Sequence, residues 1–276
     1  MNLQETIVKD KRLINYHLNR YLKFGPGVPS RLKQAIRYAV LGPGKRLRPI
    51  FALEAFKACG GKNFSWIIPV CCGVEMIHNF SLIQDDLPSM DNDDFRRGRL
   101  SLHRRFDEGT AILAADALLA RAYELFALSP APMDRKNRVI LLISQAIGAE
   151  GMAGGQVLDI MPKSEQGKKA ELEYFHIARL KTAELIGVSI LTGAVIAGVA
   201  PAIEKRLYRL GVGLGVLFQI TDDILDFKQD QRPRGINRIR EEAEILAQNT
   251  QKGFSALGGK FWFFSEIATY IVNRKR

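Results

Sequence analysis

Two apolar helices that each end in a cluster of aspartates constrain this chain most. The first apolar run covers residues 67–83 and is followed by Asp85, Asp86 and Asp91. Its hydrophobic residues occupy nearly every face, which is typical of a buried helix. Pro88 disfavours the helical conformation at Leu87, so the helix should end near there. The carboxylates then lie at a helix C-terminus, where the backbone is already partly negative, and they should recruit cations.

The second cluster repeats this arrangement late in an apolar run that spans residues 210–220. It contains Asp222, Asp223 and Asp226, with Gln219 one turn before Asp223. Asp222 and Asp226 are one helical turn apart, so they share a face. Carboxylate oxygens suit Mg²⁺, which proteins usually hold with one or two carboxylates together with substrate phosphates.

The remaining pattern predicts an all-α fold, because no stretch shows a sustained strand-like alternation. Further helices are expected at residues 3–24, 31–41, 111–128, 139–147, 174–186 and 239–248. No linker divides the 276 residues, so we expect one domain, 1–276. The uncharged run 185–203 resembles a membrane span, but its small residues and Pro201 favour a packed internal helix, and no membrane span is expected.

Charge and cysteine content narrow the functional classes. The formal net charge is +11, which fits either nucleic-acid binding or an anionic small substrate. No zinc-ligand spacing, RNA-binding aromatic motif or helix-turn-helix pattern is present, so no nucleic-acid partner is expected. Three cysteines, two of them adjacent in an apolar helix, indicate no disulfide framework and favour a cytoplasmic location.

Basic residues gather near the acidic clusters. Lys45, Arg46 and Arg48 occupy a predicted loop between Gly44 and Pro49. Such a loop is either a solvated turn or a clamp for a diphosphate, whose oxygens match arginine geometry. Arg96 and Arg97 follow the first acidic cluster. They are expected either to form surface ion pairs, which add little stability, or to contact the phosphates of a ligand.

Three further polar residues lie in apolar surroundings. His78 precedes Asp85 by two turns and shares its face, so it is either a core residue or a ligand contact. Lys181 needs a buried acid or an anionic substrate, because an unpaired buried charge is costly. Asp159 follows a glycine-rich stretch at 151–155 and is not explained by helix packing alone.

In this order, the motifs resemble those of the trans-type polyprenyl diphosphate synthases. The resemblance covers residues 44–226 and, less closely, the C-terminal 270–275. Each motif is weak alone, but the ordered set is specific. The resemblance implies an isoprenoid-synthase-type helical bundle around a central cavity, usually as a homodimer.

The resemblance also implies the site residues. Three Mg²⁺ ions would be held across the cavity by Asp85, Asp86, Asp91, Asp222, Asp223 and Asp226. The catalytic set would be Asp85, Asp86, Asp91, Asp222 and Asp223 together with Lys181. The allylic diphosphate would contact Arg96, Lys181, Thr182 and Gln219. The isopentenyl diphosphate would contact Lys45, Arg48, His78 and Arg97.

The implied reaction is a Mg²⁺-assisted ionisation, condensation and elimination that joins isopentenyl diphosphate to dimethylallyl or geranyl diphosphate. By the same resemblance, Phe80 and Ser81 form the floor of the product tunnel. An aromatic residue at position 80 is like the bacterial farnesyl diphosphate synthases, with a geranylgeranyl diphosphate synthase as the alternative. Helical geometry puts Phe80 about 140° from Asp85, so a side-wall or ordinary core role stays open.

The chain departs from the family pattern after Asp226. The usual Lys-x-Thr segment is absent, so the region is shortened. We hypothesise that Lys228, Arg232 or Arg234 replaces the lost lysine. A non-catalytic partner subunit is the alternative, although the persistence of all six acids favours catalysis. A terpene cyclase is disfavoured because it has no second diphosphate for residues 44–49 to hold.

Overall fold

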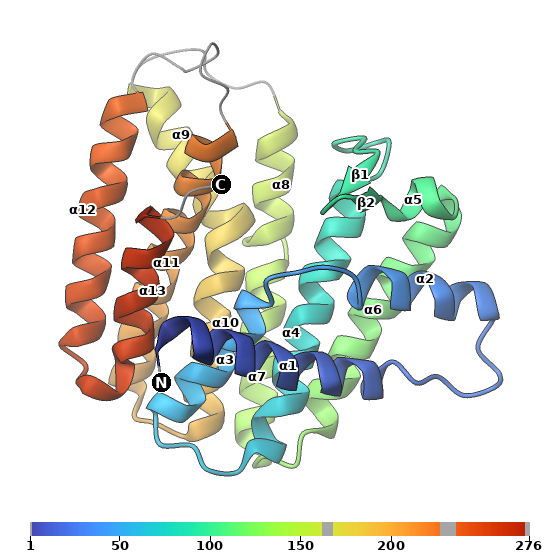
Figure 1. Cartoon of the computed structure of the whole chain (residues 1–276), viewed down its shortest axis with the longest axis horizontal. Coiled ribbons are helices and arrows are strands. Elements are labelled where there is room, and N and C mark those ends of the chain that lie inside the picture. Colours follow the sequence, from blue (N-terminus) through green and yellow to red (C-terminus); the bar gives the residue numbers. More distant parts are fainter. Residues whose placement is uncertain (1, 162–167, 227–235, 274–276) are drawn as a thin grey trace. The chain divides into compact units, whose positions relative to one another are not determined.

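The computed structural model describes residues 2–161, 168–226 and 236–273, and these are predominantly helical (Figure 1). Side chains are described for residues 2–161, 172–225 and 241–273. The predicted all-α class is confirmed. In this part of the chain, the only strands are β1 (Phe95–Arg96) and β2 (Arg99–Leu100), which pair antiparallel. The sequence pattern missed this hairpin because two-residue strands are too short to show alternation.

The chain divides into two compact units. The first consists of Met1–Leu53 and Asn63–Ile140, and the second of Glu54–Lys62 and Leu141–Arg276. Each unit carries one of the two acidic clusters. The candidate replacements Lys228, Arg232 and Arg234 lie outside the described residues, as do the side chain of Asp226 and residues 274–276.

The first unit is built around α4 (Phe64–Asp85), which packs lengthwise against α6 (Glu108–Leu128) (Figure 1). Most residues of α4 from Ile67 to Ile77 are buried, because this helix is apolar on nearly all faces. Around this pair lie α1 (Leu3–Tyr21), α2 (Ser30–Val40), α5 (Leu102–Arg105) and the first parts of α3 (Leu47–Ala58) and α7 (Met133–Ile147).

The second unit is a set of helices that pack in succession. α10 packs on α11, α11 on α12, and α12 on α13. Besides the last parts of α3 and α7, its elements are α8 (Met152–Ile160), α9 (Lys168–Ala178), the π-helix η1 (Arg179–Ala183), α10 (Glu184–Ala197), α11 (Pro201–Asp226), α12 (Ile236–Ser255), the 3-10 turn η3 (Gly259–Phe261) and α13 (Trp262–Asn273).

Two helical stretches of the described chain are long and apolar enough to cross a membrane. They are Phe64–Asp85 and Leu172–Ala197, and 72% and 83% of their apolar windows are buried inside the protein. This burial is expected of core helices. The internal position predicted for residues 185–203 is confirmed for α10, but the run is not one helix. The helix α10 ends at Ala197, because Gly198 adopts a left-handed conformation with a φ of 81°. The next helix, α11, begins at Pro201.

Three local predictions can be compared with the structure. The expected end of the first apolar helix near Leu87 is confirmed, since α4 ends at Asp85. The loop predicted at residues 44–49 is shorter in the structure, because α3 already begins at Leu47. Pro49 does not prevent this, since proline is tolerated in the first turn of a helix. The single α-helix predicted at 174–186 is wrong, because residues Arg179–Ala183 form a π-helical segment.

Candidate active site

The first acidic cluster forms a compact turn at the C-terminus of α4. The amide of Asp91 donates to the carbonyl of Asp85 over 2.9 Å, and the amide of Met90 donates to Leu87 over 2.9 Å. The turn therefore returns Asp91 to the helix end where Asp85 lies. The Asp85 residue is half-buried and Asp91 is exposed. Their position next to the negative end of the helix dipole favours a cation at this turn.

Asp86 has a different environment from its neighbours. It is 3% exposed, and its Oδ1 accepts hydrogen bonds from Nε of Arg96 at 2.7 Å and from Nη2 of Arg96. Arg96 also donates to Asp93 over 2.8 Å. Burial raises the pKa of Asp86, although the bond and the charge of Arg96 oppose this. Two residues predicted for different roles, metal ligand and substrate contact, are therefore bonded to each other.

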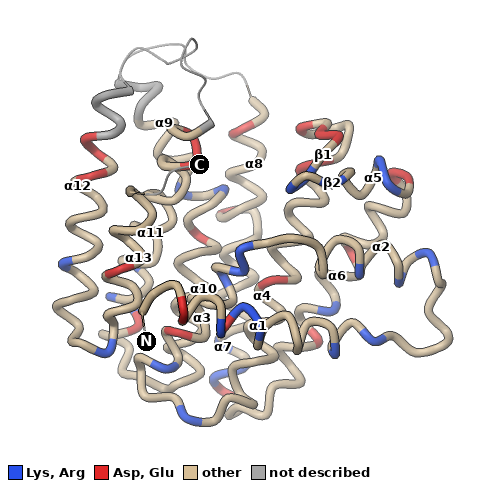
Figure 2. The backbone as a smooth tube through the Cα atoms, in the orientation of Figure 1, with Lys and Arg blue, Asp and Glu red and all other residues tan. Residues whose placement is uncertain are grey.

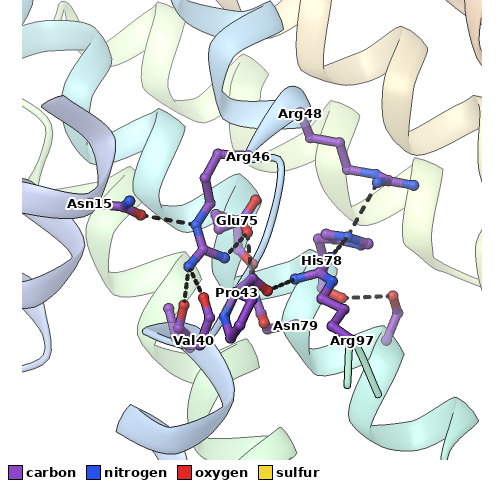
Figure 3. Close-up of polar contacts among 11 residues, drawn as sticks. Asn15, Val40, Pro43, Arg46, Arg48, Glu75, His78, Asn79 and Arg97 are labelled. Atoms are coloured by element: carbon purple, nitrogen blue, oxygen red, sulfur yellow. Dashed lines mark hydrogen bonds and ion pairs between the residues drawn. The ribbon is translucent and has the colours of Figure 1, made fainter. Parts of the chain in front are cut away.

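The same unit contains a cluster of cations around His78. Nη1 of Arg48 lies 3.3 Å from Nε2 of His78, and Nη2 of Arg97 lies 3.1 Å from the same nitrogen (Figure 3). Guanidinium groups only donate, so Nε2 must accept. Burial, together with the charges of Arg48 and Arg97, holds the pKa of His78 well below its usual value of 6.5. The neutral imidazole therefore adds no positive charge to that of the two arginines. Lys45 is exposed on the loop that precedes α3.

The sequence leaves two roles open for His78, a core residue or a ligand contact on the face of Asp85. Its described ring contacts are two arginines, which places it in the cationic cluster. Figure 2 shows acidic and basic positions close together around β1 and β2, where the turn after α4 leads into the hairpin. Among the predicted chain-length residues, Phe80 and Ser81 are half-buried on α4, and the Ser81 hydroxyl donates to the His78 carbonyl over 3.0 Å.

In the second unit, a hydrogen-bonded chain links three of the predicted residues. Thr182 Oγ1 donates to Gln219 Oε1 over 2.7 Å, and Gln219 Nε2 donates to Asp223 Oδ1 over 2.8 Å. The hydroxyl of Tyr174 donates to Asp223 Oδ2 over 2.6 Å. Both oxygens of Asp223 are thus oriented by the protein. Asp222 and Asp226 lie on the same helix, α11, and the side chain of Asp226 is outside the described part.

Lys181 has the acidic partner that its sequence context required. Its Nζ lies 2.6 Å from Oδ2 of Asp159 on α8. Both side chains are about one-quarter exposed, so the ammonium group keeps access to solvent. A Cβ on Gly155 would lie 2.4 Å from the backbone nitrogen of Lys181, so the glycine allows α8 to approach η1 closely. π-helical segments of this kind occur frequently at functional sites.

Sequence reasoning missed two residues of these clusters, Glu75 and Tyr174, and assigned a third, Arg46, to the wrong environment. Glu75 and Arg46 form a buried ion pair at 2.7 Å, and Tyr174 orients Asp223. Glu75 carries a usable signal, since it is a charged residue inside an otherwise apolar helix and needs a partner. The sequence groups Arg46 with Lys45 and Arg48 in one basic loop that could hold a diphosphate. This grouping is wrong for Arg46, because this residue is buried (3% exposed) and its charge is neutralised by Glu75. Nothing in the local sequence marks Tyr174.

The described residues contain no group of three or more His, Cys, Asp or Glu arranged to hold a metal ion. The donors that are present nevertheless fit Mg²⁺. Asp85 and Asp91 share one turn, and carboxylates in such numbers usually bind Mg²⁺ together with substrate phosphates rather than in a complete protein cage. The arrangement therefore suits a metal that arrives with a diphosphate.

Comparisons with known proteins agree with this chemistry. The model of the family described as polyprenyl synthetase matches residues 29–238. A farnesyl diphosphate synthase from Micrococcus luteus is 42% identical over 226 residues, covering 81% of this chain and 76% of the relative. A geranylgeranyl diphosphate synthase from Cyanophora paradoxa is 32% identical, covering 99% and 97%. The structure of an FPP/GFPP synthase from Zymomonas mobilis has a TM-score of 0.88 and 30% identity, covering 98% and 99%.

Proposed function

Because this chain belongs to the polyprenyl synthetase family and is a short-chain polyprenyl diphosphate synthase, we propose that it makes farnesyl diphosphate. The family uses a divalent metal and joins isopentenyl diphosphate to an allylic diphosphate. The proposed allylic substrates are dimethylallyl and geranyl diphosphate. The relatives include both farnesyl and geranylgeranyl diphosphate synthases, so product length rests on the chain's own residues.

One observation carries the proposal: α4 presents two different kinds of anion site. Its C-terminal end carries the acidic turn of Asp85 and Asp91, which binds a diphosphate only if cations neutralise it. Two turns earlier, His78 is part of a cationic cluster with Arg48 and Arg97, whose guanidinium groups are suited to bind an anion without a metal. Seven helical residues span about 10 Å. A reaction that brings together one metal-bound and one arginine-bound diphosphate explains both sites.

We assign the residues accordingly. Asp85, Asp91 and Asp222 are proposed Mg²⁺ ligands, with three ions as the proposed number. Asp86, Asp223 and Asp226 are the other three of the six aspartates proposed to hold the metal ions. Bound Mg²⁺ would stabilise the negative charge that develops on the leaving diphosphate. Lys181, Thr182, Gln219 and Arg96 are proposed to contact the allylic substrate, and Lys45, Arg48, His78 and Arg97 the isopentenyl diphosphate.

In the proposed reaction, the allylic C–O bond breaks and its electron pair leaves with the diphosphate. The double bond of isopentenyl diphosphate attacks the resulting allylic cation and forms the new C–C bond. The adduct then loses a proton to the released diphosphate, which restores a double bond. Lys181 supports this sequence because its ammonium group is positioned by Asp159 and carries donors suited to a leaving phosphate.

The test is a product assay with purified protein. Isopentenyl and dimethylallyl diphosphate are supplied with Mg²⁺, and the dephosphorylated product is separated by chromatography. A fifteen-carbon alcohol supports the proposal, and a twenty-carbon alcohol supports the geranylgeranyl alternative. No turnover, combined with capture of an active synthase, supports a non-catalytic subunit.

We also propose a homodimer, a single catalytic domain over 1–276 and a cytoplasmic location. Large apolar side chains of α6 are exposed, including Ile112 (42%), Leu113 (62%) and Leu128 (63%), as expected of a helix that a second copy covers. The family match runs through both units, which supports one domain. None of the three cysteines, all of which lie in the described part of the chain, forms a disulfide, which fits a reducing compartment.

A further inference from the structure

Arg46 and Glu75 form an ion pair in the interior of the first unit. Arg46 Nη1 lies 2.7 Å from Glu75 Oε1, and the side chains are 2% and 1% exposed. Glu75 Oε2 is buried without a hydrogen-bond partner among the described residues. Buried pairs are weak contributors to stability, because desolvation offsets their attraction. A buried carboxylate that is only partly satisfied therefore needs another explanation.

The Arg46 guanidinium connects four separate segments (Figure 3). Besides Glu75 on α4, it donates through Nε to Asn15 on α1 at 3.0 Å. Through Nη2 it donates to the carbonyls of Val40 at 2.7 Å and Gly42 at 2.6 Å. These carbonyls lie at the end of α2 and in the loop that follows it. Arg46 thus fixes the loop that connects α2 to α3.

The loop backbone is strained where Arg46 holds it. Arg46 has a φ of 58°, a conformation that non-glycine residues seldom adopt and that persists only where surrounding contacts impose it. A Cβ on Gly44 would lie 2.7 Å from Nη1 of Arg46 and 2.7 Å from Nη1 of Arg97. The chain at Gly44 therefore passes tightly between two guanidinium groups, one buried and one in the cationic cluster.

The loop in turn holds the cationic cluster. The carbonyl of Pro43 accepts a hydrogen bond from Nη1 of Arg97 at 3.0 Å, and Arg97 contacts His78 through its other terminal nitrogen. A continuous set of contacts therefore runs from Glu75 through Arg46 to the loop carbonyls and on to Arg97. Lys45 is exposed on the same loop.

We infer that Glu75 and Arg46 are positioning residues for the isopentenyl diphosphate site: they touch no substrate but set the loop that places Arg97, His78 and Lys45. This inference rests on the proposed function for the identity of the anion. Because Glu75 neutralises Arg46, the pair orients the cluster without adding charge to it. The pair is therefore expected to affect one diphosphate and not the other.

The test uses Glu75→Gln, which keeps the shape of the side chain and removes its charge. We expect binding of inorganic diphosphate without divalent metal, measured by calorimetry, to weaken between about tenfold and about a hundredfold, the range for a displaced positioning group. We expect KM for isopentenyl diphosphate to rise by a similar factor. KM for the allylic substrate and kcat should change less than about twofold, because the acidic turn and Lys181 keep their partners.

Two further variants complete the design. Glu54→Gln is the matched control, since Glu54 is a 7% exposed helical acid that is also paired with a cation, Lys57. It should leave diphosphate binding unchanged. The double variant Arg46→Gln, Glu75→Gln leaves no lone buried charge and serves if the single variant does not fold. Its loss of affinity should match that of Glu75→Gln, because both variants remove the same ion pair.

The outcomes separate the inference from the proposed function. Unchanged diphosphate binding in both Glu75→Gln and the double variant overturns the inference, as does an equal rise of KM for both substrates. A fall in kcat alone also overturns it, because that result indicates general damage to the fold. If wild-type protein turns over nothing but Glu75→Gln still weakens diphosphate binding, the proposed function fails and the positioning role stands.

Discussion

Nε of Arg96 lies 2.7 Å from Oδ1 of Asp86, so the second aspartate of the first cluster is bonded to a cation of the protein itself. Asp85 is the last residue of α4, and Asp91 lies on the turn that follows it. The three acids lie within one short segment of the sequence but have different environments, and they should not respond equally to substitution.

The first prediction concerns this difference. We expect Asp85→Asn and Asp91→Asn to lower kcat/KM by at least about a thousandfold, because each removes a carboxylate proposed to bind Mg²⁺ beside the leaving group. Asp86→Asn should cost about ten- to a hundredfold, the range for a residue that orients others. Steady-state kinetics at saturating Mg²⁺ measures this, and equal losses in all three variants contradict it.

The second prediction concerns Tyr174, whose hydroxyl donates to Asp223 Oδ2 over 2.6 Å. Burial and the carboxylate raise the pKa of Tyr174, so the hydroxyl remains a donor at neutral pH. Tyr174→Phe should raise the Mg²⁺ concentration needed for half-maximal activity about tenfold, because Asp223 loses one of its two orienting bonds.

Tyr208→Phe is the matched control for Tyr174. Tyr208 also donates to a carboxylate of the second unit, Glu184, but that acid lies outside the acidic motif. Its substitution should leave the Mg²⁺ dependence unchanged. An equal shift in both variants indicates a general effect of losing a half-buried tyrosine hydroxyl, and the orienting role of Tyr174 is then wrong.

The third prediction is a dependence of stability on pH. His78 has a pKa well below 6.5 in the folded protein, so at mildly acidic pH the unfolded chain binds a proton at this position that the folded chain does not. The contribution of His78 to the free energy of unfolding is therefore fully present above pH 6.5, and it is lost as the pH falls below that value. The loss relative to pH 8 reaches up to about 1.4 kcal/mol at pH 5.5.

Urea unfolding at pH 8 and pH 5.5 measures this contribution. His78→Asn removes the titrating group, so the variant should lose less stability than wild type between the two values. The comparison uses the change with pH within each protein, which removes any constant effect of the substitution. Parallel pH profiles for the two proteins show that His78 is not held neutral.

The fourth prediction concerns product length. If Phe80 limits chain growth, Phe80→Ala should lengthen the product by one or more five-carbon units while turnover continues. Phe64→Ala is the matched control, since Phe64 begins the same helix and is 43% exposed. Chromatography of the dephosphorylated products compares both. An unchanged product from Phe80→Ala assigns Phe80 to the core.

Local chemistry explains what could be predicted. The apolar faces of residues 67–83 and 210–220 require buried helices, and Pro88 ends the first of them, so α4 and the acidic turn follow from neighbouring residues alone. The shared turn of Asp85 and Asp91 depends on the same few residues. These features depend on interactions over one or two helical turns, which a sequence displays directly.

Other features depend on residues far apart in the chain. The π-helical segment at Lys181 and Thr182 is not encoded by periodicity, because a bulge of this kind leaves the apolar pattern almost unchanged. Tyr174 is 49 residues from Asp223 along the chain, and Asp159 is 22 residues from Lys181. Pairings of this range exist only after the helices have packed.

By itself, the sequence of this protein determined its helical class, the end of its first acidic helix and the residue types suited to diphosphate chemistry. Only the tertiary structure decided which charges meet: Arg46 with Glu75, Asp86 with Arg96, and His78 between two arginines. The physical reason is that helix formation is governed by nearby residues, whereas the partner of a buried charge is chosen by packing. An arginine in a basic run is therefore assigned to the interior or to the substrate only when the fold is known.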